Sequence, residues 1–190
     1  MPPKAKVTKE DIIEAAFIIA KENGFSAITA RTLAKHLGCS VAPIYVNFKT
    51  IDELMDAVIK RVFALSEELM AEQNGSDVFE NMGKASIAFA RKYPVLLREL
   101  IMKPNPYMEN YDTVENYLLE TMAKSEEMKD WTLEERRRLL LKVRCFQIGM
   151  EVMLANRMIP SWFQEDDAET LLMEVGEDLF LGQNRKYREG

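Results

Sequence analysis

The stretch Thr29–Leu54, TARTLAKHLGCSVAPIYVNFKTIDEL, decides the fold of this chain. It contains two short helical segments, at about 30–37 and 41–47, separated by a three-residue turn. Gly38 permits a sharp turn because glycine adopts the left-handed backbone conformation at no steric cost, and Ser40 is placed to cap the second segment. This arrangement predicts a helix-turn-helix, whose second helix would lie in the major groove of DNA with its N-terminal residues at base edges.

Apolar residues recur with helical period along nearly the whole chain, and no segment shows a convincing strand alternation. Three Thr residues, at 8, 50 and 132, are followed three positions later by an acidic residue, the spacing of a capping box. Pro160 is expected to end the eighth helix. The predicted helices lie at about 8–23, 30–37, 41–47, 50–72, 77–92, 95–102, 112–126, 133–157 and 167–184.

The sequence therefore predicts an all-α fold of about nine helices in two parts. Residues 1–49 form an N-terminal three-helix helix-turn-helix domain for DNA binding. Residues 50–190 form a larger C-terminal helical domain for ligand binding and dimerisation. The boundary falls inside or just before the fourth helix, which makes it continuous rather than a flexible linker.

The charge distribution differs between these two parts. The whole chain has a net charge of −6, but residues 1–49 hold seven Lys or Arg and four acidic residues, a net +3. The remainder holds 18 basic and 27 acidic residues, a net −9. A basic end on an acidic body is typical of a protein that contacts nucleic acid at one end only.

Composition excludes several other classes of protein. Apolar residues make up 47% of the chain, enough for a sizeable core, and no apolar run approaches the ~18 residues of a spanning helix. No signal peptide is evident, so we expect a cytoplasmic protein without membrane contact. Cys39, Cys145 and the single His36 have no metal-like spacing, which excludes a structural zinc site, and no cofactor motif appears. Cys145 is expected to be inert core.

The helix-turn-helix stretch resembles a known family. The pattern T-x-R-x-L-A-x-x-x-G-x-S-x-x-x-x-Y-x-x-F-x-x-x-x-x-L begins at Thr29 and follows an amphipathic helix that ends in Asn-Gly-Phe. This pattern is similar to that of the TetR family of bacterial transcription regulators, and the close match covers about residues 8–60. The resemblance implies a homodimeric repressor that binds a pseudo-palindromic double-stranded DNA operator and is released by a small-molecule effector.

The resemblance also implies roles for individual positions. Phosphate contacts are implied for Thr29, Ser40, Tyr45 and Lys49. Positions near the DNA are Arg31, Val41, Ala42, Pro43 and Asn47. Core positions are Phe25, Leu33, Ala34, Leu37, Ile44 and Phe48. Ile51 departs from the family, which often has Lys there, and Asn47 stands where His is common. Since Ala42 and Pro43 offer few hydrogen bonds, base reading would rest on thymine methyl contacts and on Asn47.

The C-terminal helices carry two further predicted sites. The ligand site is assigned to Met102, Tyr107, Tyr111, Met122, Arg144, Gln147, Met150 and Glu151. The methionines suit an adaptable apolar site, or they fill the core. Arg144, Gln147 and Glu151 share one helical stripe, which suits a polar group of a ligand or a subunit interface.

The predicted dimer interface lies on the last two helices. Its residues are Gly149, Val152, Met153, Leu172, Val175, Gly176 and Leu179. Glycine inside a helix costs about 1 kcal/mol relative to alanine, and close approach of two helices is one reason to tolerate it. Packing of these glycines within one subunit is the other.

Two other functions remain open at this point. One is a small all-helical enzyme, although the sequence has no nucleophile–base pair, P-loop or dinucleotide fingerprint. The other is a helical interaction protein without specific DNA binding, which Ile51 and the poor hydrogen-bonding capacity of Ala42 and Pro43 keep in play. Specific, salt-dependent DNA binding would separate both from a regulator.

Overall fold

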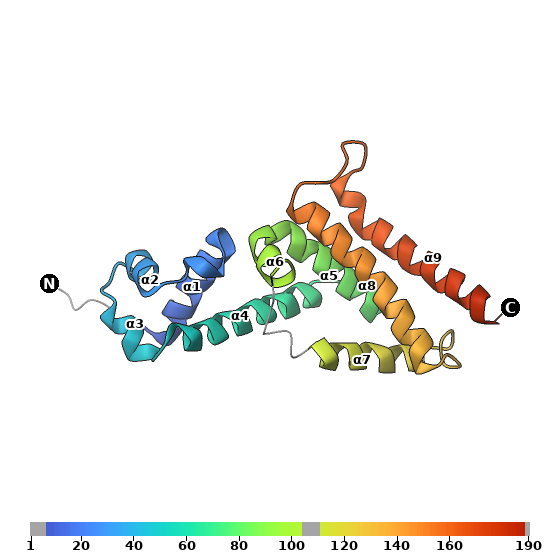
Figure 1. Ribbon diagram of the computed structural model, residues 1–190, viewed down its shortest axis with the longest axis horizontal. Helices are drawn as coiled ribbons and strands as arrows, with labels where there is room; N and C mark the ends of the chain where they lie inside the picture. Colours follow the sequence, from blue (N-terminus) through green and yellow to red (C-terminus); the bar gives the residue numbers. More distant parts are fainter. Residues whose placement is uncertain (1–6, 104–110, 189–190) are drawn as a thin grey trace.

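A computed structural model describes residues 7–103 and 111–188 of the chain. Within these ranges the chain is all-helical, with nine α-helices, two short 3-10 helices and no strand, so the predicted fold class is confirmed (Figure 1). The elements are α1 Lys9–Asn23, η1 Phe25–Ala27, α2 Ala30–Leu37, α3 Ala42–Asn47, α4 Ile51–Ala71, α5 Val78–Lys92, α6 Pro94–Ile101, α7 Tyr111–Lys124, α8 Leu133–Ala155, η3 Glu165–Asp167 and α9 Ala168–Arg188.

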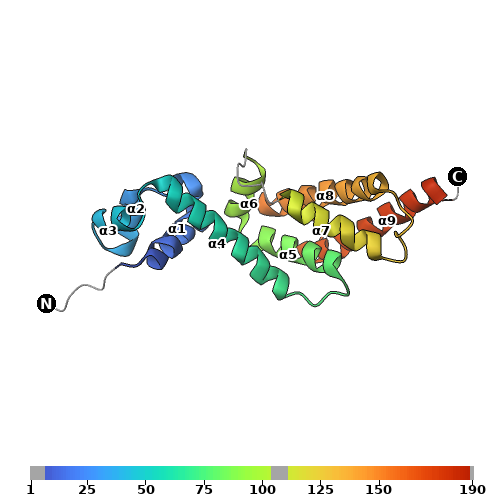
Figure 2. The ribbon, with the colours of Figure 1, turned by 90° about the horizontal axis from the view of Figure 1, so that it is seen from below.

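The molecule has two parts joined by α4. Helices α1 to α3 form one end, and α5 to α9 form a bundle at the other (Figures 1 and 2). α4 packs against both α1 and α5, and its residues Leu54, Val58 and Val62 are almost fully buried. The predicted boundary between residues 49 and 50 thus lies at the start of a helix that both parts share.

The helix starts at Thr8, Thr50 and Thr132 follow the capping chemistry that the sequence predicts, except in one detail at α4. The capping boxes that open α1 and α8 form with both of their hydrogen bonds. At α4, the Thr50 hydroxyl accepts from the Glu53 N–H at 3.1 Å, but Glu53 Oε2 accepts from the N–H of Lys49 at 2.9 Å. The predicted box at α4 is therefore only half formed, because the carboxylate reaches one residue further back.

The end of α8 differs from the prediction. The helix ends at Ala155, and Arg157 takes a left-handed conformation with φ of 55°. The Arg157 N–H donates to the Leu154 carbonyl at 3.2 Å, and the Met158 N–H donates to the Met153 carbonyl at 2.8 Å. These two bonds form a Schellman motif. This motif ends α8 before Pro160 is reached, so the prediction that Pro160 stops the helix is wrong.

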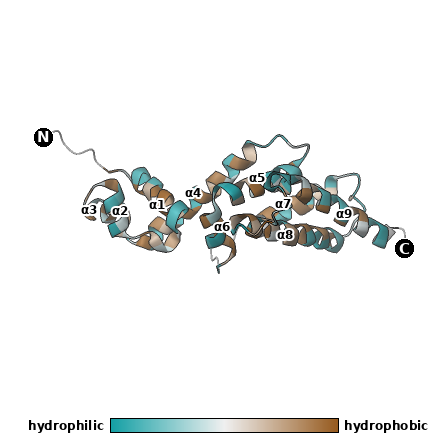
Figure 3. Cartoon of the chain, turned by 90° about the horizontal axis from the view of Figure 1, so that it is seen from above, coloured by the Kyte–Doolittle hydropathy of each residue, from teal (hydrophilic) through white to brown (hydrophobic). Residues whose placement is uncertain are grey.

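Hydrophobic and hydrophilic residues both occur along the described helices (Figure 3). None of the described helices is long and apolar enough to cross a membrane. Cys145 was expected in the core and is exposed, so that prediction is wrong. It lies on the side of α8 that carries the exposed Leu141 and Gly149, and among the described residues no other helix covers this side.

Helix α6 lies between the two parts and contacts both. Its Arg98 donates through Nη1 to the carbonyl of Ala155, at the end of α8, at 2.7 Å. Its Glu99 lies against Gly24, at the end of α1, where an added Cβ would come within 2.8 Å of Glu99 Oε1. Gly24 also has φ of 84°, and this backbone conformation favours glycine there.

Candidate nucleic-acid interface and bundle cavity

The turn between α2 and α3 is built as the sequence predicts. Thr29 caps α2, its hydroxyl accepting from the Thr32 N–H at 3.1 Å. At the other end Gly38 has φ of 63°, and the Cys39 N–H donates to the Ala34 carbonyl at 3.0 Å. An added Cβ at Gly38 would meet nothing within 4 Å, so glycine is required there by the backbone conformation alone.

Helix α3 begins one residue later than expected. Val41 is its N-cap, without a side-chain cap bond, and the Ile44 N–H donates to the Val41 carbonyl at 3.2 Å. Ser40 therefore lies outside the N-cap position, and the prediction that it caps α3 is wrong. Pro43 occupies the first turn and has no N–H, which removes one of the donors that a capping side chain would satisfy.

Two buried side chains fix the rotation of α3. Ile44 and Phe48 are each 1% exposed and pack in the core with Leu33 and Ala34 of α2. Lys9 Nζ lies 4.8 Å from the centre of the Phe48 ring, a cation–π contact that ties the start of α1 to the end of α3. Phe25 and Leu37, also predicted as core, are half-buried against the same cluster.

This rotation presents one face of α3 to solvent. Val41, Tyr45 and Val46 are 41%, 54% and 80% exposed. Large side chains on the outer face of the second helix of a helix-turn-helix are placed to meet a DNA groove. Val46 was missed by the sequence reasoning. The signal for it was present, because it lies off the Ile44–Phe48 stripe and directly beside Tyr45.

Most of the residues assigned to DNA lie on the surface of this end of the molecule. Those that are exposed are Thr29, Arg31, Ser40, Val41, Ala42, Tyr45 and Lys49. Pro43 and Asn47 are half-buried. Asn47 Nδ2 donates to the Pro43 carbonyl at 2.8 Å, so its amide is bonded to its own helix rather than turned outward.

A second candidate site is a cavity of about 590 Å³ in the helical bundle, partly open to solvent. Its walls come from α5, α7, α8 and α9 and from the loops before α5 and before α8. The lining residues are Ser76, Asp77, Phe79, Glu80, Met82, Gly83, Val114, Leu118, Met122, Met128, Leu139, Leu140, Val143, Arg144, Gln147, Leu172, Met173, Gly176, Glu177 and Phe180. This volume lies in the range of small-molecule sites.

The cavity brings together only part of the predicted ligand set. Met122, Arg144 and Gln147 line it. Met150 and Glu151 are buried in α8 but are not among the lining residues, and Met102 is 60% exposed at the end of α6. Tyr107 lies outside the described residues. Tyr111 begins α7, but its side chain is not among those described.

Several apolar residues of the cavity wall were missed. Phe79 and Met82 of α5 and Met173 and Phe180 of α9 line it. In the sequence these residues have the same helical spacing as core residues. No local signal separates a residue that faces a cavity from one that faces a neighbouring side chain.

Glu151 is a buried carboxyl directly behind the polar part of the cavity. It is 4% exposed and accepts a hydrogen bond from Gln147 Nε2 at 2.9 Å. Burial raises the pKa of Glu151, while the hydrogen bonds from Gln147 and Ser86 and the charge of Arg144 lower it to a lesser extent. The predicted stripe of Arg144, Gln147 and Glu151 is thus one connected polar group inside the chain.

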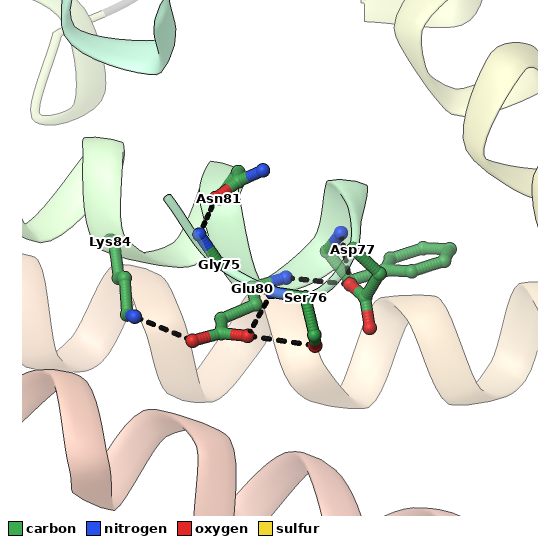
Figure 4. A network of polar contacts seen from close by, with 7 residues as sticks. Gly75, Ser76, Asp77, Glu80, Asn81 and Lys84 are labelled. Carbon is green, nitrogen blue, oxygen red and sulfur yellow. Dashed lines mark hydrogen bonds and ion pairs between the residues drawn. The ribbon is translucent and has the colours of Figure 1, made fainter. Parts of the chain in front are cut away.

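A polar network fixes the loop at the start of α5, beside the cavity (Figure 4). Glu80 accepts from the N–H and hydroxyl of Ser76 through Oε2, at 2.7 and 2.9 Å, and from Lys84 Nζ through Oε1. The hydrogen bond from Lys84, followed by those from Ser76, lowers the pKa of Glu80 to about 2. Asp77 Oδ1 caps α5 by accepting from the N–H groups of residues 79 and 80.

The predicted interface residues fall into two groups. Gly149 is exposed, and Val152, Met153 and Val175 are half-buried. Leu172 is 2% exposed in the chain's own core, and Gly176 lines the cavity, so these two face inward. Leu179 packs against the cluster around Trp131. The predicted interface on α9 thus includes residues from the side of the helix that faces the chain's own bundle.

The chain matches known proteins over its N-terminal part. The family model "Bacterial regulatory proteins, tetR family" matches residues 12–58, which run from α1 into α4. Tetracycline repressor protein class D of Escherichia coli is 27% identical over 119 residues, 60% of this chain and 53% of that protein. The HTH-type transcriptional repressor DrrR1 of Streptomyces coeruleorubidus is 30% identical over 98 residues, 50% of this chain and 36% of that protein.

A third relative is the HTH-type transcriptional repressor Rv1353c of Mycobacterium tuberculosis. It is 35% identical over 68 residues, 36% of this chain and 25% of that protein. The chain spans about half the length of the tetracycline repressors it matches, and less of the other two. The matched residues hold the helix-turn-helix described above, and over residues 12–58 the chain is similar to the tetR family of bacterial regulatory proteins.

Proposed function

We propose that this protein is a cytoplasmic transcription regulator that binds double-stranded DNA as a homodimer and represses transcription until a small molecule releases it. The observation that carries the proposal is the orientation of α3. Ile44 and Phe48 are buried and fix its inner face, while Val41, Tyr45 and Val46 are exposed on its outer face. The names of the relatives, which are transcriptional repressors, favour this function over that of a small helical enzyme.

DNA binding would combine contacts to phosphate, which hold the protein in position, with contacts to thymine methyl groups, which recognise bases. The exposed Tyr45 hydroxyl and Lys49 ammonium are suited to phosphate oxygens, which fix position without reading sequence. Val41, Ala42 and Val46 are suited to thymine methyl groups in the major groove. Because Asn47 is bonded to the Pro43 carbonyl, it would read a base only after giving up that bond.

Homodimer formation is supported by the open face of α8. Leu141 is 61% exposed, and Cys145 and Gly149 follow it at four-residue intervals on the same side. Leu181 of α9 is 42% exposed. A small or apolar stripe of this length on a helix that lacks a covering neighbour suits contact with a second copy, and two copies would match the two half-sites of a pseudo-palindrome.

Release would follow from a two-state equilibrium. An effector in the bundle cavity would favour the dimer conformation in which the two α3 helices no longer match successive major grooves. The shared helix α4 leads from the cavity-bearing bundle to the DNA-binding end, so a change in one part has a rigid route to the other.

The test measures specific DNA binding and the dependence of its affinity on salt concentration. Fluorescence anisotropy with the DNA upstream of the protein's own gene should give an affinity that falls with salt. Lys49→Ala should lower the slope of log K against log salt by about 1 per half-site, because each phosphate contact releases counterions. Lys60→Ala, exposed on α4 outside the helix-turn-helix, is the matched control and should leave the slope unchanged.

An unchanged slope for Lys49→Ala would remove this residue from the phosphate contacts. Absence of any specific DNA binding would favour the helical interaction protein instead.

The dimer is tested separately on α9. Val175→Glu should yield monomers that remain helical and lose operator binding, since a charge would be buried in the contact. Thr170→Glu, at an exposed position five residues earlier, is the control. Sedimentation gives the mass and circular dichroism the helix content. A Val175→Glu protein that stays dimeric would place the interface elsewhere.

A further inference from the structure

The apolar walls of the cavity are rich in methionine. Met82, Met122, Met128 and Met173 line it from three helices and a loop. Methionine is unbranched and adapts to irregular apolar shapes, so these walls suit an extended chain better than one rigid outline. Phe79 and Phe180 add apolar surface.

The acids at the rim are already engaged or face solvent. Both carboxylate oxygens of Glu80 are hydrogen-bonded, and its charge is compensated by Lys84 (Figure 4). Asp77 is exposed and holds the start of α5 through Oδ1. Glu177 is exposed on α9. A cationic ligand would therefore have to compete with solvent or with the fold for these groups.

Two further polar residues of the lining, Arg144 and Gln147, come from α8. Arg144 and Gln147 are half-buried, lie one turn apart on one stripe and both line the cavity. One N–H of the Gln147 amide donates to Glu151, and an amide nitrogen has two such donors. Arg144 presents a guanidinium with several donors. This part of the cavity thus offers positive charge and N–H groups.

We propose that the cavity binds an apolar chain that ends in a carboxylate, with the carboxylate at Arg144 and Gln147. Arginine binds carboxylates through paired, charge-assisted hydrogen bonds, and the partial burial of this site strengthens them. Glu151 lies behind the site and is 4% exposed, and this burial raises its pKa, whereas the nearby charge of Arg144 lowers it to a lesser extent. The regulatory consequence of this binding rests on the function proposed above, but the binding itself does not.

The protein carries its own reporter for the test. Trp131 is 5% exposed and stacks on Phe180 at 5.5 Å between ring centres, and Phe180 lines the cavity. The chain has two tryptophans, and the other, Trp162, is 80% exposed. Trp162→Phe therefore leaves Trp131 as the single fluorophore.

Three probes of equal chain length separate the ligand classes. Dodecanoate, dodecanol and dodecyltrimethylammonium are titrated below their micellar concentrations into the Trp162→Phe protein. We expect saturable quenching or a spectral shift with dodecanoate, and at least about tenfold weaker binding of the cation. Tighter binding of the cation, or no saturable binding of dodecanoate, would overturn the proposal.

A variant then tests the head-group site. Arg144→Met should weaken dodecanoate about tenfold or more and leave dodecanol within about twofold, because only the charged contact is lost. Arg138→Met is the matched control, since Arg138 is exposed two turns earlier on α8 and pairs with Glu134 of the same helix. Equal weakening of both probes would overturn the assignment. If Arg144→Met does not fold, Gln147→Leu tests the same point.

DNA binding is measured in the same samples, so the two proposals fail separately. Dodecanoate should release wild-type protein from operator DNA at concentrations that saturate Trp131. Specific DNA binding without saturable dodecanoate binding would overturn the ligand assignment alone. Saturable dodecanoate binding without DNA binding would overturn the regulator and keep the ligand assignment.

Discussion

The proposed DNA-binding end, formed by α1 to α3, and the helical bundle, formed by α5 to α9, differ in where their candidate functional residues lie. At the DNA-binding end the interior is filled, with Ile12 and Leu33 at 0% exposure, and the candidate residues point outward. In the bundle the candidate residues point inward to a cavity of about 590 Å³. The first site is an exposed surface whose orientation is fixed by a closely packed core. The second is a cavity where the packing of the bundle is incomplete.

This difference has a consequence for stability. A filled core loses packing with every atom removed, whereas a wall that borders empty space has less to lose. The DNA-binding end should therefore tolerate few changes inside and many outside. The bundle should tolerate changes at the cavity wall, because its residues there already lack neighbours on one side.

The largest expected effect comes from Phe48→Ala. Phe48 is 1% exposed and carries both the core contact of α3 and the Lys9 contact, so its loss should cost about 3–5 kcal/mol of unfolding free energy. Val143→Ala, at the half-buried cavity wall, should cost about 1 kcal/mol. Urea unfolding of both variants measures the difference. Equal costs would show that the cavity wall is packed as tightly as the core.

The second-largest expected effect is a difference in stability between alanine substitutions at two glycines. Gly38→Ala should cost about 1–2 kcal/mol, because φ of 63° is strained for a residue with Cβ. Gly149→Ala should instead stabilise the folded chain by up to about 1 kcal/mol, since its Cβ would enter open space within a helix.

Sedimentation completes this comparison. If Gly149 lies in a close helix contact between two subunits, the alanine variant should raise the dimer dissociation constant even though it stabilises the helix. A Gly149→Ala dimer as tight as wild type would move the contact away from this residue.

The smallest expected effect is a pH dependence from Glu151. Its pKa is raised above the ordinary 4.5 in the folded state, so the folded protein holds this proton more tightly than the unfolded chain. Stability from this group is complete below pH 4.5 and falls as pH rises through the folded pKa. Glu151→Gln has no charge to bury and should remove that decline.

The measurement is the melting temperature between pH 4.5 and pH 8. For a chain of this size about 1 kcal/mol corresponds to roughly 2–4 °C. The wild-type Tm should fall more than that of Glu151→Gln over this range. A parallel course of the two curves would show that Glu151 is solvated or fully compensated when ionised.

The N-terminal end could be predicted because its structure is determined by near neighbours in the chain. Thr29 caps α2, Gly38 ends it and Ile44 and Phe48 anchor α3, all within 20 residues. Helix periodicity and capping chemistry are sufficient for such a motif. The failure at Ser40 is local too, since a shift of one residue in the start of α3 was enough to displace the cap.

The bundle could be predicted only as a set of helices. Its helix ends fall within a few residues of their predicted positions, but Cys145 is exposed and Leu172 is buried, against expectation. Which face of a long helix is covered depends on where its partners lie, and α5 is far in the sequence from α8 and α9, against which it packs. The cavity depends on all of them, so no local pattern could indicate it.

The position of α6 connects the end of α8 to the end of α1. Two adjacent residues, Arg98 and Glu99, reach in different directions, one to the end of α8 and the other to the end of α1. The helix is eight residues long, and the Glu99 side chain lies against Gly24 and also pairs with Lys103. A displacement of the last turn of α8 would thus have a route to the first helix of the DNA-binding end through α6, besides the route through α4.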